Sequence, residues 1–316
     1  MINLLKPRIF ALLASTIVLS GCQNPATDIL DILAPVGAPS LALYSYATDS
    51  HFVTNASVPV IKAAFFDETT DIIIVDHQQG LKQITEQNAD FSLARIITKG
   101  NLHLVGLNKA ADAIPTSADH IISFGAASAV VNEVLFHLYP DIAPIVTFVA
   151  SLSDIAPIMT LGQYNQTAVD FVLVAEPLLS KVVSNSNGDI IYQPQINLQT
   201  AWHDATALDG YPQAGLFVRN ATYEAKPELI EEFLLEIDQN ITNLISNPAE
   251  VKIDIDENGD TTWQTNKFGI ETTTMVTLQE VENRLGMTVG GIDVNEFNAL
   301  IDIPLIPDAV FSPLYK

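Results

Sequence analysis

Cysteine is almost absent from this chain of 316 residues, in which Cys22 is the only one. A single thiol cannot build a disulfide framework within one chain, and it cannot supply the several thiolates of a structural zinc site. Bases are also scarce, with 14 Lys and Arg against 37 Asp and Glu, which gives a formal net charge of −23. Because nucleic-acid binding depends on clustered Lys and Arg, this composition argues against a nucleic-acid partner.

The common catalytic signatures are missing as well. The sequence contains no Gly-x-Ser-x-Gly elbow, no His-Glu-x-x-His pair and no Gly-x-x-x-x-Gly-Lys phosphate loop. Its histidines lack the spacing of metal ligands, so we expect ordinary surface or buried histidines, with His77 set apart because it follows a predicted strand. The six are His51, His77, His103, His120, His137 and His203. These absences predict no cofactor and no metal site.

Beyond the N-terminus no segment has the roughly 20 apolar residues of a membrane span. Residues 1–21 have the pattern of a signal peptide, with the bases Lys6 and Arg8, an apolar run over 9–19 and small residues at its end. The last residues, Leu-Ser-Gly-Cys at 19–22, resemble the bacterial lipobox. This resemblance implies cleavage after Gly21, lipidation of Cys22 and a short tether over 22–30. The mature net charge would be about −25.

With 48% hydrophobic and 16% charged residues, the remaining chain is long enough to bury a large core. Apolar runs at 32–35, 72–75, 102–107, 121–123, 145–149 and 171–174 predict strands. Helices are predicted at 41–47, at 130–138 and from Pro227 to Ile245, and a hairpin is predicted over 251–264. Alternating strands and helices indicate an α/β chain with parallel sheets, and the length favours two lobes.

The predicted hairpin carries side chains with oxygen ligands at alternate positions, Asp254, Asp256 and Asn258, followed by Gly259 and Asp260, as a calcium loop begins. The twelfth position of such a loop should be a bidentate Glu, and here it is Thr265. We therefore expect a solvated turn there instead of an ion site.

Four turns follow predicted strands, at 37–40, 76–79, 125–128 and 175–177. In open α/β sheets ligands collect at the carboxyl ends of parallel strands, where helix N-termini offer unpaired N–H groups. Small residues in these turns let a ligand approach the backbone closely. Taken singly, each turn is better explained as a tight loop, so the prediction depends on all four together.

Six segments, at 35–43, 71–80, 100–106, 123–128, 175–177 and 211–218, follow the order seen in lipoprotein solute-binding components of bacterial ABC importers. The chain most resembles the nitrate, sulfonate and taurine or thiamine-precursor type, with the type II periplasmic-binding fold. It departs from that pattern at Asp76-His77-Gln78-Gln79, where smaller or apolar residues are common, and in the predicted hairpin.

The resemblance implies a two-lobed α/β fold, each lobe a mostly parallel sheet flanked by helices. One lobe would hold residues 30–108 and 209–316, and the other 109–208. A small-molecule ligand would bind between them, on Gly37, Ala38, Pro39, Ser40, His77, Gln78, Gly100, Asn101, Gly125, Ala126, Ser128, Glu176 and Gln213. The partners would be an ABC transporter permease and ATPase, with the protein held by lipid on the extracytoplasmic face of a cell membrane or in the periplasm.

Two other functions remain open from the sequence. The same fold carries enzymes, a pyrimidine-synthesis enzyme and a dehydratase of menaquinone formation, but the predicted lipobox would place them in the wrong compartment. A ligand sensor or adhesin that does not transport is the other alternative. Because Lys99 is the main base near the motifs, we expect a singly charged or neutral ligand over a multiply charged anion.

Overall fold

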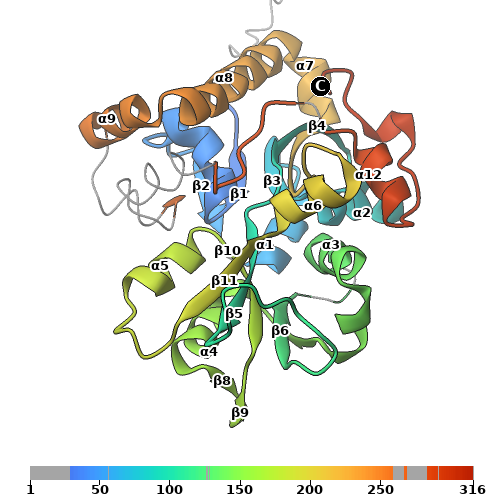
Figure 1. Cartoon of the computed structure of the whole chain (residues 1–316). Coiled ribbons are helices and arrows are strands. Elements are labelled where there is room, and N and C mark those ends of the chain that lie inside the picture. The colour runs from blue at the N-terminus through green and yellow to red at the C-terminus, as the bar shows by residue number, and fades with distance from the viewer. Residues whose placement is uncertain are drawn as a thin grey trace, which may run out of the picture.

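The computed structural model describes residues 29–55, 57–125, 127, 129–258, 267–268, 283–290 and 292–315. Within these residues, two five-stranded sheets flanked by helices form the two halves of the molecule (Figure 1). The long helix α8 (Pro227–Ser246) and its successor α9 (Pro248–Asn258) lie across the outer end of the first half. The fold is therefore mixed α/β with mostly parallel sheets, as the sequence predicts.

The first sheet has the strand order β2-β1-β3-β12-β4. Its strands are β1 (Ile32–Pro35), β2 (Phe52–Asn55), β3 (Ile72–Asp76), β4 (Phe91–Thr98) and β12 (Ala214–Arg219). All run in one direction except β12, which is antiparallel to both of its neighbours. Helices η1 (Ala38–Tyr46), α1 (Val58–Ala63), η2 (Ala64–Phe66), α2 (His77–Gln87), α7 (Asn220–Ala225), α12 (Val294–Leu300) and η5 (Asp308–Val310) accompany this sheet.

The second sheet has the order β11-β5-β10-β6-β7, and here β5 alone is reversed. Its strands are β5 (Leu102–Leu107), β6 (Ile121–Phe124), β7 (Thr147–Val149), β10 (Phe171–Ala175) and β11 (Tyr192–Asn197), and a separate hairpin joins β8 (Gln163–Tyr164) to β9 (Thr167–Ala168). Its helices are α3 (Val130–Leu138), η3 (Pro140–Ile145), η4 (Leu152–Asp154), α4 (Ile155–Leu161), α5 (Leu178–Ser184) and α6 (Leu198–Thr206).

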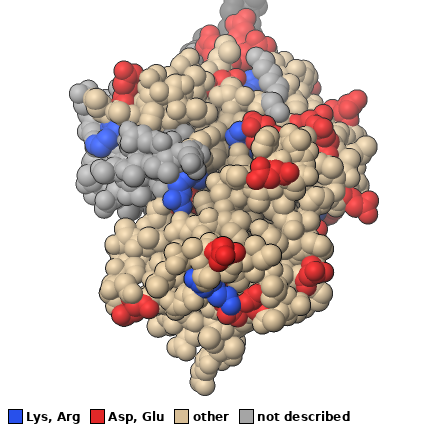
Figure 2. Space-filling model, viewed as in Figure 1, with Lys and Arg blue, Asp and Glu red and all other residues tan. Residues whose placement is uncertain are grey.

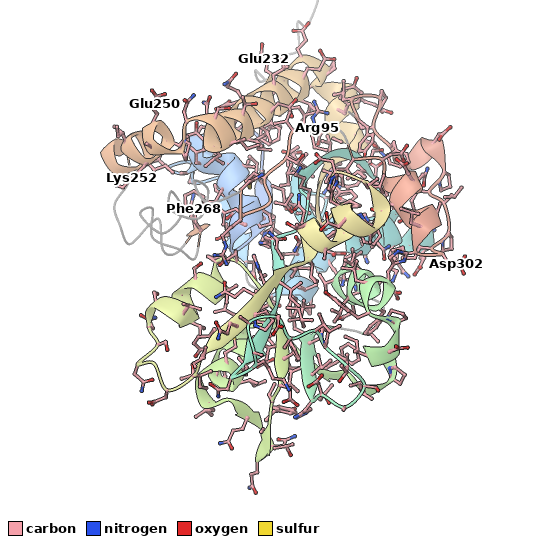
Figure 3. The ribbon with its side chains drawn as sticks, in the orientation of Figure 1. Arg95, Glu232, Glu250, Lys252, Phe268 and Asp302 are labelled. Carbon is pink, nitrogen blue, oxygen red and sulfur yellow. The ribbon has the colours of Figure 1, made fainter. Side chains whose placement is uncertain are left out.

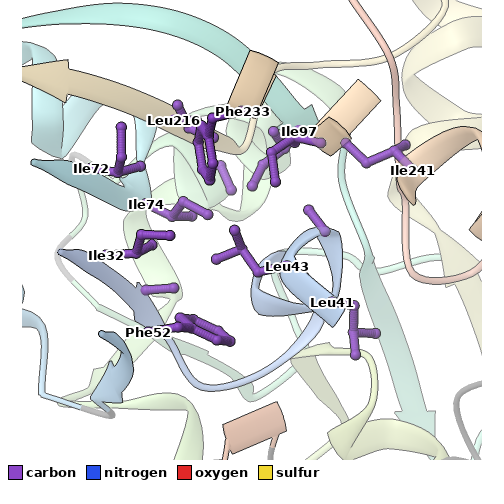
Figure 4. Packing of buried hydrophobic residues seen from close by; sticks show 14 of the residues in the cluster. Ile32, Leu41, Leu43, Phe52, Ile72, Ile74, Ile97, Leu216, Phe233 and Ile241 are labelled. Atoms are coloured by element: carbon purple, nitrogen blue, oxygen red, sulfur yellow. The ribbon is translucent and has the colours of Figure 1, made fainter. Parts of the chain in front are cut away.

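The core of the first half explains the β-branched run of β3. Ile72 and Ile74 pack with Phe233 of α8 on one face (Figure 4). Ile73 and Val75 belong to a second cluster on the other face. All four isoleucine and valine side chains are at most 3% exposed. A strand covered on both faces needs apolar residues at every position, which is the pattern that predicted it.

The amphipathic stripe of α8 is confirmed in its central part, from Ile230 to Leu244, although Ile245 is exposed. Below this helix the buried guanidinium of Arg95 donates to Asp238 of α8 at 3.0 Å and to the carbonyl oxygen of Leu314. Arg95 thus ties β4 to α8 and to the C-terminal residues (Figure 3), and both ends of this ion pair are largely removed from water.

The predicted hairpin over 251–264 is wrong as far as Asn258, because residues 248–258 form helix α9. Val251 and Ile255 are buried one helical turn apart, while Ile253 between them is 55% exposed. The same residues satisfy a two-residue and a four-residue period, and packing against α8 selects the second. Residues 254–258 are helical and form no calcium-type loop, and Gly259, Asp260 and Thr265 lie outside the described residues.

Another expectation needs correction at the boundary between the halves. Residues up to 108 are expected in the first lobe, but β5 pairs with β10 and β11 of the second sheet. The chain therefore changes sheets at Lys99–Asn101, between β4 and β5, and returns after α6 to enter β12.

Gly80 in α2 tests this packing. A Cβ at residue 80 would lie 2.2 Å from the ring of Phe217 in β12. Gly80→Ala should therefore lower the free energy of unfolding by about 1–3 kcal/mol through overpacking, although alanine favours helix more than glycine does. Urea denaturation measures the change. The exposed Glu86→Ala on the same helix is the control and should stay within about 0.5 kcal/mol; a Gly80→Ala protein as stable as wild type would contradict the packing.

Candidate site at the facing edges of the two sheets

The predicted turns lie at two sheet edges that face each other. In the first sheet Ala214, where β12 begins, pairs with Asp76 and Thr98, the last residues of β3 and β4. In the second sheet Leu102, where β5 begins, pairs with Ala175, the last residue of β10. Only residues 99–101 separate the ends of β4 and β5. The carboxyl ends of the parallel strands in both sheets therefore point toward the same junction.

Four of the predicted residues meet at this junction through hydrogen bonds. The backbone N–H of Asn101 donates to Gln213 Oε1 at 3.0 Å, and Asn101 Nδ2 donates to the backbone oxygen of Glu176 at 2.8 Å. The backbone N–H of His77 donates to the carbonyl oxygen of Gln213 at 2.9 Å. Asn101, Glu176, Gln213 and the start of α2 thus form one connected group, in which Asn101 and Gln213 link the two crossing segments directly.

Glu176 is held by an ion pair that the sequence analysis missed. Arg284 Nη2 lies 2.6 Å from Glu176 Oε1, and the Glu176 side chain is fully buried while that of Arg284 is 21% exposed. The backbone N–H and the hydroxyl of Ser180 also donate to this carboxylate, each at 3.0 Å. Burial raises the pKa of Glu176, and the nearby Arg284 guanidinium acts in the opposite direction.

Arg284 belongs to a segment that runs beside the first sheet. Met287 forms an antiparallel bridge with Thr98 at the end of β4, and the N–H of Lys99 donates to the Gly286 carbonyl oxygen at 2.7 Å. From there Arg284 contacts Glu176 and, at 3.3 Å, Gln195 Oε1 of β11, both in the second half. No local motif marks Arg284, since its contacts are with residues 89 or more positions away.

His77 begins a helix where the sequence predicts a turn at 76–79. It is the first residue of α2, its ring is fully buried, and it packs edge-on against Phe297 of α12 at 6.0 Å between ring centroids. Phe297 in turn contacts Trp202 of α6. Burial lowers the pKa of His77 to about 3, so its imidazole is neutral at neutral pH. Asp76 caps α2 through Gln79 N at 3.0 Å, and burial raises the pKa of Asp76 to about 6.

His103 is a second buried histidine, 4% exposed, and lies between Leu102 and Leu104 in β5. Burial, with the nearby charge of Arg284, lowers its pKa to about 3. The spacing of the histidines does not distinguish His103 from the others. The signal that identifies it is its position inside an apolar strand directly after Gly100-Asn101.

The predicted glycines divide into open and filled positions. Among the described residues, a Cβ at Gly37 would meet no atom within 4 Å, and one at Gly125 only Ala129 at 3.8 Å, whereas at Gly100 it would lie 2.4 Å from the Tyr211 ring. Gly37 and Gly125 have φ of +121° and +76°, and no described side chain fills the space beside them, so a ligand can approach their backbone there. Gly100 is instead required by packing.

The remaining predicted residues are placed as follows. Ala38, Pro39 and Ser40 begin η1, and the buried Ser40 hydroxyl donates to the Gly37 carbonyl oxygen at 2.7 Å. Gln78 is buried in the first turn of α2, and no described residue accepts a hydrogen bond from its Nε2. Lys99 pairs with Asp209 at 2.8 Å. Ala126, Ser128 and Cys22 lie outside the described residues.

A further hollow lies away from this junction. A cavity of about 490 Å³ lies in the second half between β7, α4 and β8, and none of the predicted residues lines it. No group of three or more His, Cys, Asp or Glu among the described residues is arranged to hold a metal ion. Over the same residues, every helix is too short or too polar to cross a membrane.

Comparison with known proteins gives matches of structure alone. No protein-family model and no curated protein sequence matches the chain. The ligand-binding component of an ABC-type import system from Staphylococcus aureus, with zinc bound, superposes with a TM-score of 0.63 and 10% identity over 86% of this chain and 90% of its own.

Two further solved structures agree with it. The alkanesulfonate-binding protein SsuA from Xanthomonas axonopodis pv. citri, bound to MOPS, gives a TM-score of 0.59 and 13% identity, covering 90% of this chain and 97% of its own. The periplasmic nitrate-binding protein NrtA from Synechocystis gives 0.56 and 10%, covering 84% and 74%. At these identities the likeness establishes the fold. The chain has the two-sheet architecture of these solute-binding proteins. The ligands named for those structures are stated of those proteins and are not assigned to this chain.

The burial of His77 predicts sensitivity to acid. In the unfolded chain its imidazole takes up a proton near pH 6.5, but in the folded protein only near pH 3. The unfolded state therefore binds more protons in this window, so stability is lost as pH falls from 6.5 toward 3, by at most about 1.4 kcal/mol per pH unit from this group. His77→Phe should flatten that slope, as measured by urea denaturation from pH 7 to 4. An unchanged slope would contradict the assignment.

Proposed function

We propose that this protein is an extracytoplasmic solute-binding protein that captures a small molecule between its two halves and delivers it to an ABC importer. One observation carries the proposal: two sheets direct the carboxyl ends of their parallel strands at a common junction, where Gly37 and Gly125 leave open space on opposite sides. Backbone N–H groups at such strand ends are suited to hold a ligand.

The connection between the halves supports opening and closure. The chain crosses at Lys99–Asn101 and again between α6 and β12, so the two lobes are joined by two short segments. Few residues then have to change their backbone angles for one lobe to move against the other. The first lobe would comprise residues 30–98 and 214–315, with Arg284 contacting the other lobe, and the second lobe residues 102–206.

Catalysis is not part of the proposal. The compared structures are binding proteins by description, and their ligands include a sulfonate buffer and a zinc ion. Within the described residues the buried histidines at 77 and 103 have no carboxylate hydrogen-bonded to them that would make either one a general base.

Ligand binding is tested by thermal unfolding of the chain from residue 23 against a panel of sulfonates, taurine, nitrate, thiamine pyrimidines and flavins. A ligand that binds only the folded state raises the melting temperature. Gly125→Asn, which tolerates positive φ but projects into the open space, should weaken the affinity for any such solute at least tenfold. Gly188→Asn is the matched control, because Gly188 has φ +86° and an equally open Cβ position. Equal affinity in both variants would remove Gly125 from the site.

The location of the protein is tested at Cys22. In cells of a lipoprotein-processing bacterium, the wild-type chain should incorporate radiolabelled palmitate and sediment with membranes, since two acyl chains give stable anchoring. Cys22→Ser should abolish both, while Ser20→Ala, which keeps a small residue in the same motif, should preserve them. Membrane association that survives Cys22→Ser without label would contradict lipid anchoring.

A further inference from the structure

A buried polar cluster lies beside the junction, in the second half next to α5. It consists of Asn101, which directly precedes β5, His103 of β5, Glu176, which directly follows β10, and Arg284 from the segment beside β4. Asn101, His103 and Glu176 are at most 6% exposed. Asn101 bonds to the Glu176 backbone and Glu176 to Arg284. His103 lies close enough to Arg284 for the guanidinium charge to act on its pKa.

The charges in this cluster cancel. Arg284 carries one positive charge, and its Nη2 lies 2.6 Å from the carboxylate of Glu176, which also accepts two hydrogen bonds from Ser180. His103 is neutral, because its pKa lies near 3. The other base of the crossing segment, Lys99, is paired with Asp209 at 2.8 Å. No cation of this group is therefore left over to neutralise an incoming anion.

Hydrogen-bonding capacity, in contrast, is left over. Asn101 Oδ1, both ring nitrogens of His103 and Arg284 Nε are buried and have no partner among the described residues. Asn101 Oδ1 can accept a hydrogen bond and Arg284 Nε can donate one. The neutral imidazole of His103 can donate from one ring nitrogen and accept at the other. Because a buried polar atom without a partner is costly, such a set is complementary to a bound group that both donates and accepts.

We propose that this cluster selects the ligand and that it accepts an uncharged solute bearing adjacent donors and acceptors, such as an amide, a urea or a nitrogen heterocycle. The inference rests on the proposed binding function. An inorganic or sulfonate anion would bring a net negative charge into a site where the guanidinium of Arg284 is already paired with Glu176. Burying an uncompensated charge is far more costly than burying a neutral group of the same size.

The test removes the compensating carboxylate. Glu176→Gln keeps the side-chain shape but frees the charge of Arg284, so the variant should bind nitrate and ethanesulfonate at least tenfold more tightly than wild type. Affinity is measured by calorimetry and by melting temperature, with sodium chloride at equal ionic strength as the reference. Ser180→Ala is the matched control, because it removes a contact to Glu176 without changing the charge, and it should gain no anion affinity. The double variant Glu176→Gln/Arg284→Gln should lose the gain.

A wild-type measurement keeps the inference testable if Glu176→Gln does not fold. Nicotinamide and nicotinate differ in one group, which is a neutral carboxamide in nicotinamide and a charged carboxylate in nicotinate. Wild type should show no saturable binding of the anions nicotinate, nitrate or ethanesulfonate. Anion binding by wild type that Arg284→Gln abolishes would overturn the inference, as would a folded Glu176→Gln protein with no anion gain. Failure of the proposed function looks different: no solute stabilises wild type, yet Glu176→Gln still gains anion affinity.

Discussion

The arrangement of this protein depends on one constraint, the way in which the chain changes sheets. A strand that enters a sheet from the edge where the parallel strands end must run away from that edge, so it is antiparallel to them. β5 and β12, the two strands that follow a crossing, are the reversed strands of their sheets. This reversal brings the ends of β3, β4 and β10 to one junction and places Asn101 and Gln213 within hydrogen-bond distance.

Packing at the junction makes the crossing specific. Gly100 has φ +87°, and the ring of Tyr211 from the second crossing fills the space where a side chain would stand. Tyr211, Trp202, Phe297 and His77 form a continuous row of buried rings that joins α6 to α12 and α2 on one side of the junction. Arg284 and Glu176 join the halves through a buried ion pair. Breaking one partner of such a pair is strongly destabilising, because the other charge is left buried.

Local sequence patterns predict those strands and helices whose structure depends only on their own residues. The run of β3 needs apolar residues on both faces, and the stripe of α8 fits one buried helix face, so each prediction required only its own segment. Residues 251–255 fit two periods, and contact with α8 decided between them. The site divides in the same way. Asn101, Glu176 and Gln213 stand at strand ends that a pattern reveals, whereas Arg284 acquires its role from a contact with Glu176 that no spacing encodes. Gly37 and Gly100 look alike in sequence, and only the position of Tyr211 separates an open glycine from a filled one.

The shortage of bases acquires a structural meaning at this junction. On the face shown in Figure 2, Asp and Glu gather mainly over the half built on the first sheet, and Lys and Arg are few. An acidic surface of this kind repels anions at long range. At short range the bases do not attract an anion either, because Lys99 and Arg284 are each paired with an acid within 2.8 Å. Both the field of the molecule and the chemistry of the cluster therefore disfavour an anionic ligand, although two of the structures with the same fold are an alkanesulfonate-binding and a nitrate-binding protein. If the proposed binding function holds, the compensation of charge around Arg284 decides which kind of ligand the junction accepts.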